Sequence, residues 1–277
     1  MPGGKSALIV TVLQSDGKTL VTEGKGGGKV MWRDLQVAAE VVKVNGKGTV
    51  TLAKDPRVSD GKVGHVTITV PSHPELKAEL GIPVRYNSAF VANFSGAPGQ
   101  NGLDGSNGTD GISGTPGSID PNNPSSGGNG TDGTDGRDGD NGGPGGDAPA
   151  VQVRVTLRTS DPALLQITVA ASGKTKRYLV DPNGGSLTVK ADGGPGGSAG
   201  RGGRGGRGGM GGSGSPNGNN GRDGLDGHDG LSGSDGRGGL ITVTYDPAVK
   251  PYLDKIHLSA QNGPKPVFDQ QTVAALW

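Results

Sequence analysis

The sequence predicts a mostly β protein in which a β-sandwich-like base carries two inserted Gly-X-Y blocks that form a four-rod helical bundle. Three observations predict this fold. The segments around the blocks alternate apolar and polar residues, as half-buried strands do. Glycine recurs at every third position within the blocks. A proline-containing turn sequence divides each block into two runs of similar length.

The composition excludes an ordinary hydrophobic core over the whole chain. Of the 277 residues 57 are glycine and only 3% are aromatic, so the large side chains that dominate burial are scarce. The chain has no cysteine, which excludes disulfides and thiolate metal sites. A net charge of +1 excludes general attraction to nucleic acid or anionic membrane as a property of the whole chain.

The strands are expected in three places: an N-terminal β domain at 1–95, a β segment at 150–192, and a last strand with a C-terminal tail at 240–277. Alternation in "ALIVTVL" and "HVTITV" predicts strands in the first, and "VNGKGTVTL" adds an Asn-Gly turn and a short strand. In the second, "VQVRVTL", "LLQITVA", "RYLV" and "SLTV" predict a meander, whose last two strands are joined by "DPNGG".

Each glycine-rich block, 96–149 and 193–239, is expected to form a helical hairpin. The glycine phase of the first block breaks across "SIDPNNPSS" and resumes one residue out of step at Gly127. The second block keeps one phase except at Ser215, within "SGSPNG". These two sequences leave four runs of about 20 to 22 residues, which favours two hairpins over random linkers.

A period of three suits an extended polyproline II type helix, in which each triplet position forms one straight ridge. A ridge of glycine carries no side chains, so another backbone can approach and pair with it. Two alternatives remain open. One is a collagen triple helix of three chains, which the few prolines within the runs disfavour; the other is a pair of disordered linkers.

The "GGxGGx" and "Gxx" repeats from Gly96 to Gly146 and from Gly193 to Gly239 resemble the polyglycine II bundles of T-even phage tail-fibre adhesins and of a springtail antifreeze protein. They also resemble bacterial collagen-like proteins. The resemblance is one of architecture and covers roughly 100 of the 277 residues. The adhesins imply receptor binding through loops at the tip of the bundle, and the antifreeze protein implies binding of ice by a flat, regular face.

Charged residues hold fixed places in the triplets and are the candidate interaction sites. Aspartate recurs just before glycine and lines one edge of each rod, whereas three arginines follow glycine and give the third rod a basic edge. We expect the basic edge to lie against an acidic edge and to fix the order and register of the rods. The candidates are Asp132, Asp135, Asp138, Asp226, Asp229, Arg201, Arg204 and Arg207.

No cofactor is expected, although the dense aspartates leave calcium as a weak alternative. The arginine repeat raises nucleic-acid binding as a second alternative, which the lack of aromatic stacking partners disfavours. The four histidines lack metal-ligand spacing, and the chain has no nucleophile elbow, so an enzyme is not expected. The terminal Trp277 is expected either to dock on the base or to contact a partner.

The function predicted from these patterns is that of a non-enzymatic structural or interaction protein in a fibre, surface appendage or adhesive assembly. Its expected partners are other proteins or further copies of itself, as a homo-oligomer or filament. The longest apolar run, "ALIVTVL", is too short to span a membrane and has no signal-peptide features. No compartment is encoded, so a virion, cell surface or extracellular fibre is favoured on function alone.

Overall fold

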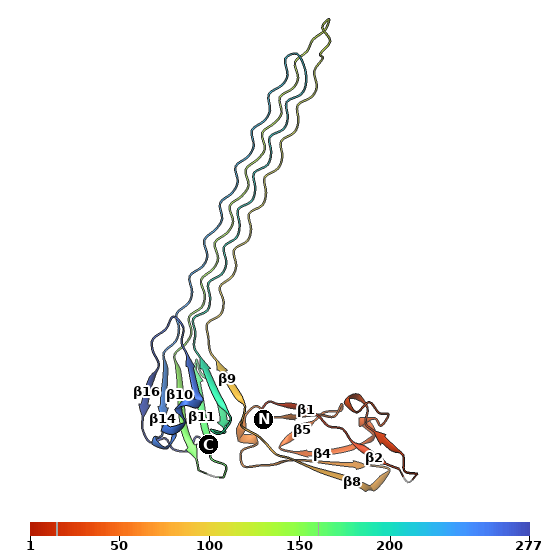
Figure 1. The fold of residues 1–277 in the computed structure, drawn as a ribbon, viewed down its shortest axis with the longest axis vertical. Helices are drawn as coiled ribbons and strands as arrows, with labels where there is room; N and C mark the ends of the chain where they lie inside the picture. The colour runs from red at the N-terminus through yellow and green to blue at the C-terminus, as the bar shows by residue number, and fades with distance from the viewer. Residues whose placement is uncertain (15, 160) are drawn as a thin grey trace.

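The computed structural model describes residues 1–14, 16–159 and 161–277. Strands predominate over helices in it, so the prediction of a mostly β fold is confirmed. Figure 1 shows a long shaft of four extended strings rising from one of two β parts. We name these strings the first segment (96–117), second segment (127–146), third segment (193–212) and fourth segment (218–239).

The N-terminal part contains two three-stranded sheets and a small hairpin. The sheet orders are β1-β6-β5 and β4-β7-β8, and β2 pairs with β3. Trp32, Val42 and Val66 lie in the core that the sheets share. The elements are β1 (Lys5–Ala7), β2 (Thr11–Leu13), β3 (Thr19–Val21), η1 (Gly24–Gly26), η2 (Trp32–Asp34), β4 (Gln36–Glu40), β5 (Val42–Val44), β6 (Thr49–Leu52), η3 (Pro56–Val58), β7 (Gly64–Val70) and β8 (His73–Ile82).

The run "ALIVTVL" does not form the single strand that its alternation predicts: Ala7 ends β1, residues 8–10 lie between strands, and Thr11–Leu13 form β2. β1 pairs with β6, whereas β2 pairs with β3. The chain changes partner at Val10, whose N–H donates to the hydroxyl of Thr22 and whose carbonyl accepts from the Thr22 N–H. Alternation could not reveal this change because Leu8, Val10 and Val12 are half-buried on both sides of it.

The second β part is the base of the shaft, and two sheets enclose its core. One sheet has the order β12-β11-β10-β14-β16 and the other β15-β13-β9. Val153, Ile167 and Leu187 are fully buried in this core. The elements are β9 (Ala89–Asn93), β10 (Val151–Arg158), β11 (Leu164–Ala171), β12 (Lys174–Val180), β13 (Ser186–Lys190), β14 (Ile241–Tyr245), η4 (Pro247–Lys255), β15 (Ile256–Ser259) and β16 (Val267–Gln270).

The predicted four-stranded meander is wrong at its last strand. β10, β11 and β12 pair antiparallel in sequence, but β13 lies in the other sheet, parallel to β9 and β15. The "DPNGG" turn carries the chain across the core, so that Leu187 and Val189 of β13 face the core from the opposite side. β9, which the sequence placed in an N-terminal domain ending at residue 95, therefore belongs to the base.

Backbone hydrogen bonds join the four segments along the whole shaft. Glycine N–H groups of the first segment donate to the third, and those of the second donate to the fourth; both pairs run parallel. The antiparallel pairs are first with second, second with third, and third with fourth. The second and third segments each bond to three neighbours, and the first and fourth to two. Every third residue of the third segment, a glycine in each case from Gly194 to Gly212, is buried as a result.

The turn in the second block explains why its glycine phase survives. The chain reverses between Gly212 and Gly218, and the Gly218 N–H donates to the Gly212 carbonyl at 2.8 Å. These two glycines are six residues apart, a multiple of three, so the reversal leaves the phase unchanged. The first block reverses between Gly117 and Gly127, a spacing that is not a multiple of three. An unbroken phase is therefore compatible with a hairpin.

The strands of the base set the register of the shaft. β9 and β13 are parallel, with Asn93 opposite Lys190, and the same offset of 97 positions recurs where Asn101 in the first segment bonds to Ser198 in the third. β10 and β14 are also parallel, with Val151 opposite Ile241. Their offset of 90 recurs in the second and fourth segments. The register of each pair of strands therefore continues unchanged into the shaft.

Replacing Gly105 by alanine should destabilise the shaft, because the added Cβ would lie 1.9 Å from the Arg137 carbonyl oxygen. Overpacking of this kind costs about 1–3 kcal/mol, occasionally more. The exposed neighbour Ser106 already carries a Cβ, so Ser106→Ala is the matched control. Thermal unfolding followed by circular dichroism should show a lower melting temperature for Gly105→Ala only. Equal melting temperatures would refute the close approach.

Candidate interaction surfaces of the shaft

Aspartate and asparagine side chains, together called Asx here, link the segments by accepting hydrogen bonds from backbone N–H groups. Most of them occupy the position just before glycine in the first, second and fourth segments; Asp147 precedes Ala148 just beyond the second segment, and Asn217 lies in the turn before the fourth. Each Oδ1 accepts from a backbone N–H at 2.6 to 3.0 Å. The acceptors are Asn101, Asp104, Asn107 and Asp110; Asn129, Asp132, Asp135, Asp138, Asn141 and Asp147; and Asn217, Asn220, Asp223, Asp226, Asp229 and Asp235.

The Asx side chain supplies an acceptor for N–H groups that do not bond to a backbone carbonyl of a neighbouring segment. In the third segment the Gly203 N–H bonds to the Arg137 carbonyl, whereas the N–H groups of Arg204 and Gly205 bond to Asn107 and Asp226. All three donors of that triplet are therefore satisfied, one by backbone and two by Asx. Asparagine and aspartate serve alike, so the shared requirement is a short side-chain carbonyl oxygen and not a charge.

The rows of Asx acceptors, called ladders here, are interrupted at several positions. Pro98 takes the place of Asx opposite Pro195, which has no N–H to donate. In the fourth segment Ser232 lies between Asp229 and Asp235, and the residue facing it in the third segment is Ala199. Pro144 also interrupts the ladder of the second segment, opposite Ser234, so a missing donor explains the break at Pro195 only.

The three arginines of the third segment form an exposed ridge between two Asx ladders. The N–H groups of Arg201 and Arg207 donate to Asp104 and Asp110 at 2.8 Å, and their carbonyls accept from glycines of the first segment. Arg204 does the same with Asn107. Within the described residues no salt bridge joins these guanidinium groups to an aspartate. The ridge is therefore next to acidic residues, but the contacts that set the register come from backbone N–H groups.

The aspartates predicted as interaction sites all lie in these ladders. Asp132, Asp135 and Asp138 accept from Arg222, Leu225 and His228 of the fourth segment, and Asp226 and Asp229 accept from Gly205 and Gly202. Sequence reasoning missed the asparagines that share the same role. The signal was present, because Asn-Gly and Asp-Gly pairs recur in one phase.

Threonines of the second segment add a further link that the sequence reasoning missed. Thr134 Oγ1 accepts from the Thr109 N–H at 2.8 Å, and Thr131 Oγ1 accepts from the Ile112 N–H at 2.7 Å. The hydroxyls join the first segment to the second, on the side where no Asx ladder lies between them.

Trp277 docks on the base, one of the two places expected for it. Its Nε1–H donates to Asp60 Oδ2 at 2.9 Å, and its ring packs near Tyr86, Leu164 and Leu179. Asp60 also pairs with Arg158 of β10. This cluster joins the base to the loop after η3, so it links the two β parts.

Asp192 links the start of the third segment to β15. We call this end of the shaft, next to the base, its root. Its Oδ1 accepts from the Ser259 hydroxyl at 2.5 Å and from the Gln261 N–H at 2.8 Å. Burial disfavours the charge, but these hydrogen bonds, with smaller contributions from Lys190 and Ser95, outweigh it and hold the pKa of Asp192 below its ordinary value. The ionised carboxylate therefore stabilises the folded root.

Other features of the described residues bear on the remaining expectations. No group of three or more histidine, cysteine or acidic residues in the described parts of the chain is arranged to hold a metal ion. None of the described helices is long and apolar enough to cross a membrane. At the tip, Ile119 in the loop between the first two segments is 76% exposed.

Comparison with protein-family models, with curated proteins and with solved structures gives no match to this chain.

Replacing Asp132, Asp135 and Asp138 together by asparagine should leave stability nearly unchanged, because the Oδ1 acceptors remain. Replacing all three by alanine removes three hydrogen bonds, each worth about 0.5–1.5 kcal/mol. Circular dichroism melts should separate the two triple variants, with the alanine variant melting lower. If asparagine proves as damaging as alanine, the charge is the essential feature and the acceptor explanation is wrong.

The contribution of Asp192 should depend on pH. Because its folded pKa is lowered, the stabilisation is complete above the unfolded pKa, about 3.9 for aspartate, and is lost as pH falls through the folded pKa. Denaturant unfolding of the wild type and of Asp192→Asn should differ most at pH 6 and converge below about pH 3.9. Asp34→Asn, an exposed change in the N-terminal part, is the control. A difference independent of pH would contradict this account.

Proposed function

We propose that this chain is a non-enzymatic structural or interaction protein whose glycine-rich blocks form a four-rod polyglycine II type bundle on a sandwich-like base. Its role is to extend a rigid shaft from a fibre, a surface appendage or an adhesive assembly. The observation that carries the proposal is the hydrogen bonding of the segments, in which glycine N–H groups bond to a neighbouring segment at every third residue.

A single-chain bundle accounts for these bonds better than a collagen trimer. A collagen helix needs three parallel chains, whereas the segments here include antiparallel neighbours supplied by one chain. Glycine ridges that would face partner chains in a trimer are already occupied by other segments of the same molecule.

Rigidity follows from the continuity between base and shaft. All four segments continue from strands of the base, so no flexible linker separates the shaft from the core. At about 3.1 Å per residue a 22-residue rod extends roughly 68 Å. A spacer of this kind holds its tip, where residues 118–126 and 213–217 reverse the chain, well away from the base.

The competing function is nucleic-acid binding by the arginine ridge, since Arg201, Arg204 and Arg207 are exposed side by side at triplet spacing. Aromatic stacking partners, which single-strand binders combine with cations, do not accompany them in the third segment. The arginine backbone is also bonded within the shaft, which favours a structural role.

Solution mass, small-angle scattering and RNA retention together test the proposal. We expect an elongated particle whose longest dimension exceeds roughly 70 Å, with no more RNA retained by the wild type than by a variant with Arg201, Arg204 and Arg207 all changed to glutamine. A trimer that loses its shape on dissociation would favour the collagen alternative. Salt-sensitive RNA retention that the glutamine variant lacks would favour nucleic-acid binding.

A further inference from the structure

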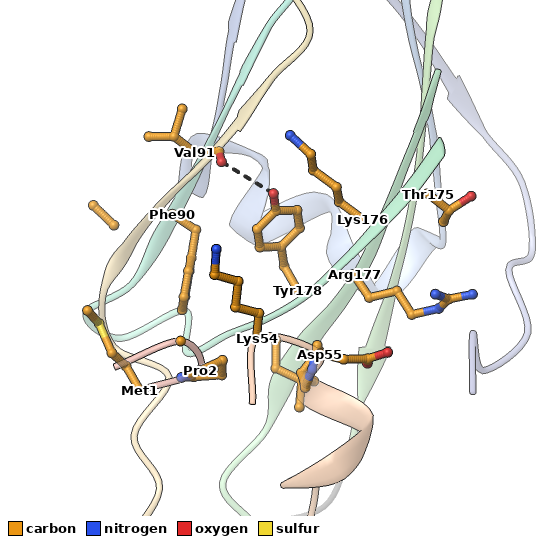
Figure 2. Close-up of a pocket in the computed structure, with 14 residues that line it drawn as sticks. Met1, Pro2, Lys54, Asp55, Phe90, Val91, Thr175, Lys176, Arg177 and Tyr178 are labelled. Atoms are coloured by element: carbon orange, nitrogen blue, oxygen red, sulfur yellow. Dashed lines mark hydrogen bonds between the residues drawn. The ribbon is translucent and has the colours of Figure 1, made fainter. Parts of the chain in front are cut away.

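A cavity of about 560 Å³ lies between the N-terminal part and the base, away from the shaft. Its walls come from residues 1–3, from the loop that begins η3, from β9 and from β12 (Figure 2). The volume is within the usual range of small-molecule sites, about 300–1,000 Å³. Residues far apart in the sequence therefore create a recess of the size of a small ligand.

Two aromatic rings form part of the wall. The rings of Phe90 and Tyr178 have centroids 5.9 Å apart and planes inclined at 53°. The Tyr178 hydroxyl donates to the Val91 carbonyl at 3.3 Å, which leaves its oxygen free to accept a further hydrogen bond. Inclined rings cannot clasp a flat base between parallel faces, but they suit the C–H faces of a non-planar sugar ring.

Positive charge predominates in this cavity. Lys54, Lys176 and Arg177 line it, and Figure 2 shows Lys54 reaching toward the space beside Phe90 and Tyr178. Among the lining residues described, Asp55 is the one acid, and it is bound by Arg57 at 2.6 Å. The side-chain hydrogen bond from Arg57 also holds the pKa of Asp55 below its ordinary value. The cavity thus presents ammonium groups whose charge the nearest carboxylate does not cancel.

The two lysines differ in how firmly they are held. Lys176 Nζ donates to the Asn93 carbonyl at 3.1 Å and lies 4.5 Å from the centre of the Phe94 ring, so its position is fixed. Lys54 is exposed and forms no salt bridge within the described residues. One cation is therefore preorganised, and the other is able to close on a ligand.

We propose that this cavity binds an acidic sugar, with its ring against Phe90 and Tyr178 and its carboxylate between Lys54 and Lys176. The aromatic faces bury the C–H surface of the ring, the lysines select the negative charge, and the oxygen of Tyr178 is able to accept from a sugar hydroxyl. This site is separate from the tip of the shaft and does not depend on the function proposed for the shaft.

Glucuronate, glucose and adenosine monophosphate are the probes that test this site. Chemical-shift titration of the isotope-labelled full chain should show millimolar glucuronate shifting signals of residues that line the cavity, while glucose, which lacks the carboxylate, binds at least tenfold more weakly. Adenosine monophosphate carries an anion on a flat base and should also bind more weakly. No shift in the cavity with glucuronate, or tighter binding of the nucleotide, would overturn the proposal.

Lys54→Gln should weaken glucuronate binding about tenfold and leave the spectrum of the rest of the chain unchanged. Lys43→Gln, an exposed change in β5 outside the cavity, is the matched control and should bind as the wild type does. Lys176→Gln tests the second cation. Because Lys176 bonds to Asn93 of β9, the signals of β9 show whether this strand keeps its fold in the variant. Wild-type affinity in both Lys54→Gln and Lys176→Gln would refute the role of the cations.

Discussion

The shaft depends on the approach of two backbones at positions where no side chain stands between them. At nearly every triplet glycine a Cβ would lie about 2 Å from a carbonyl oxygen of a neighbouring segment. The same proximity allows the N–H groups of one segment to bond to the carbonyls of another. Because each glycine N–H donates only one such bond, the shaft is stable through repetition over many triplets.

Register is the second constraint, and the base supplies it. A strict period of three allows a segment to slide by one triplet without losing glycine contacts, so the repeat alone does not specify alignment. The paired strands β9 with β13 and β10 with β14 remove that freedom, since their offsets continue unchanged into the segments. The Pro98 and Pro195 pair agrees with the same alignment. Folding of the base and ordering of the shaft are thereby coupled.

Sequence patterns predicted some parts of this structure and not others, for physical reasons. Alternation identified β10 and β11 because the alternate apolar residues of each lie in the core, and the glycine phase with the turn sequences identified runs that reverse direction. Alternation does not encode which sheet a strand joins, so the place of β13 was predicted wrongly. Likewise a glycine period is the same in all segments, and it could not show that the first lies beside the third. The aspartates were found, but as charges, because their N–H partners lie in other segments, 21 to 90 positions away.

Because aspartate and asparagine accept the same hydrogen bond, the linking of the segments and the surface charge of the shaft are determined separately. Either residue supplies the oxygen that joins segments, so the choice between them is free to set surface charge. Aspartates beside Arg201 and Arg207 place both signs of charge on one face, and exposed Leu103 and Leu225 stand among polar ridges rather than in one apolar patch. Charge at an exposed backbone edge opposes its pairing with other molecules in proteins generally. The side chains that join the segments within the chain are therefore also those that set the charge of the shaft's surface.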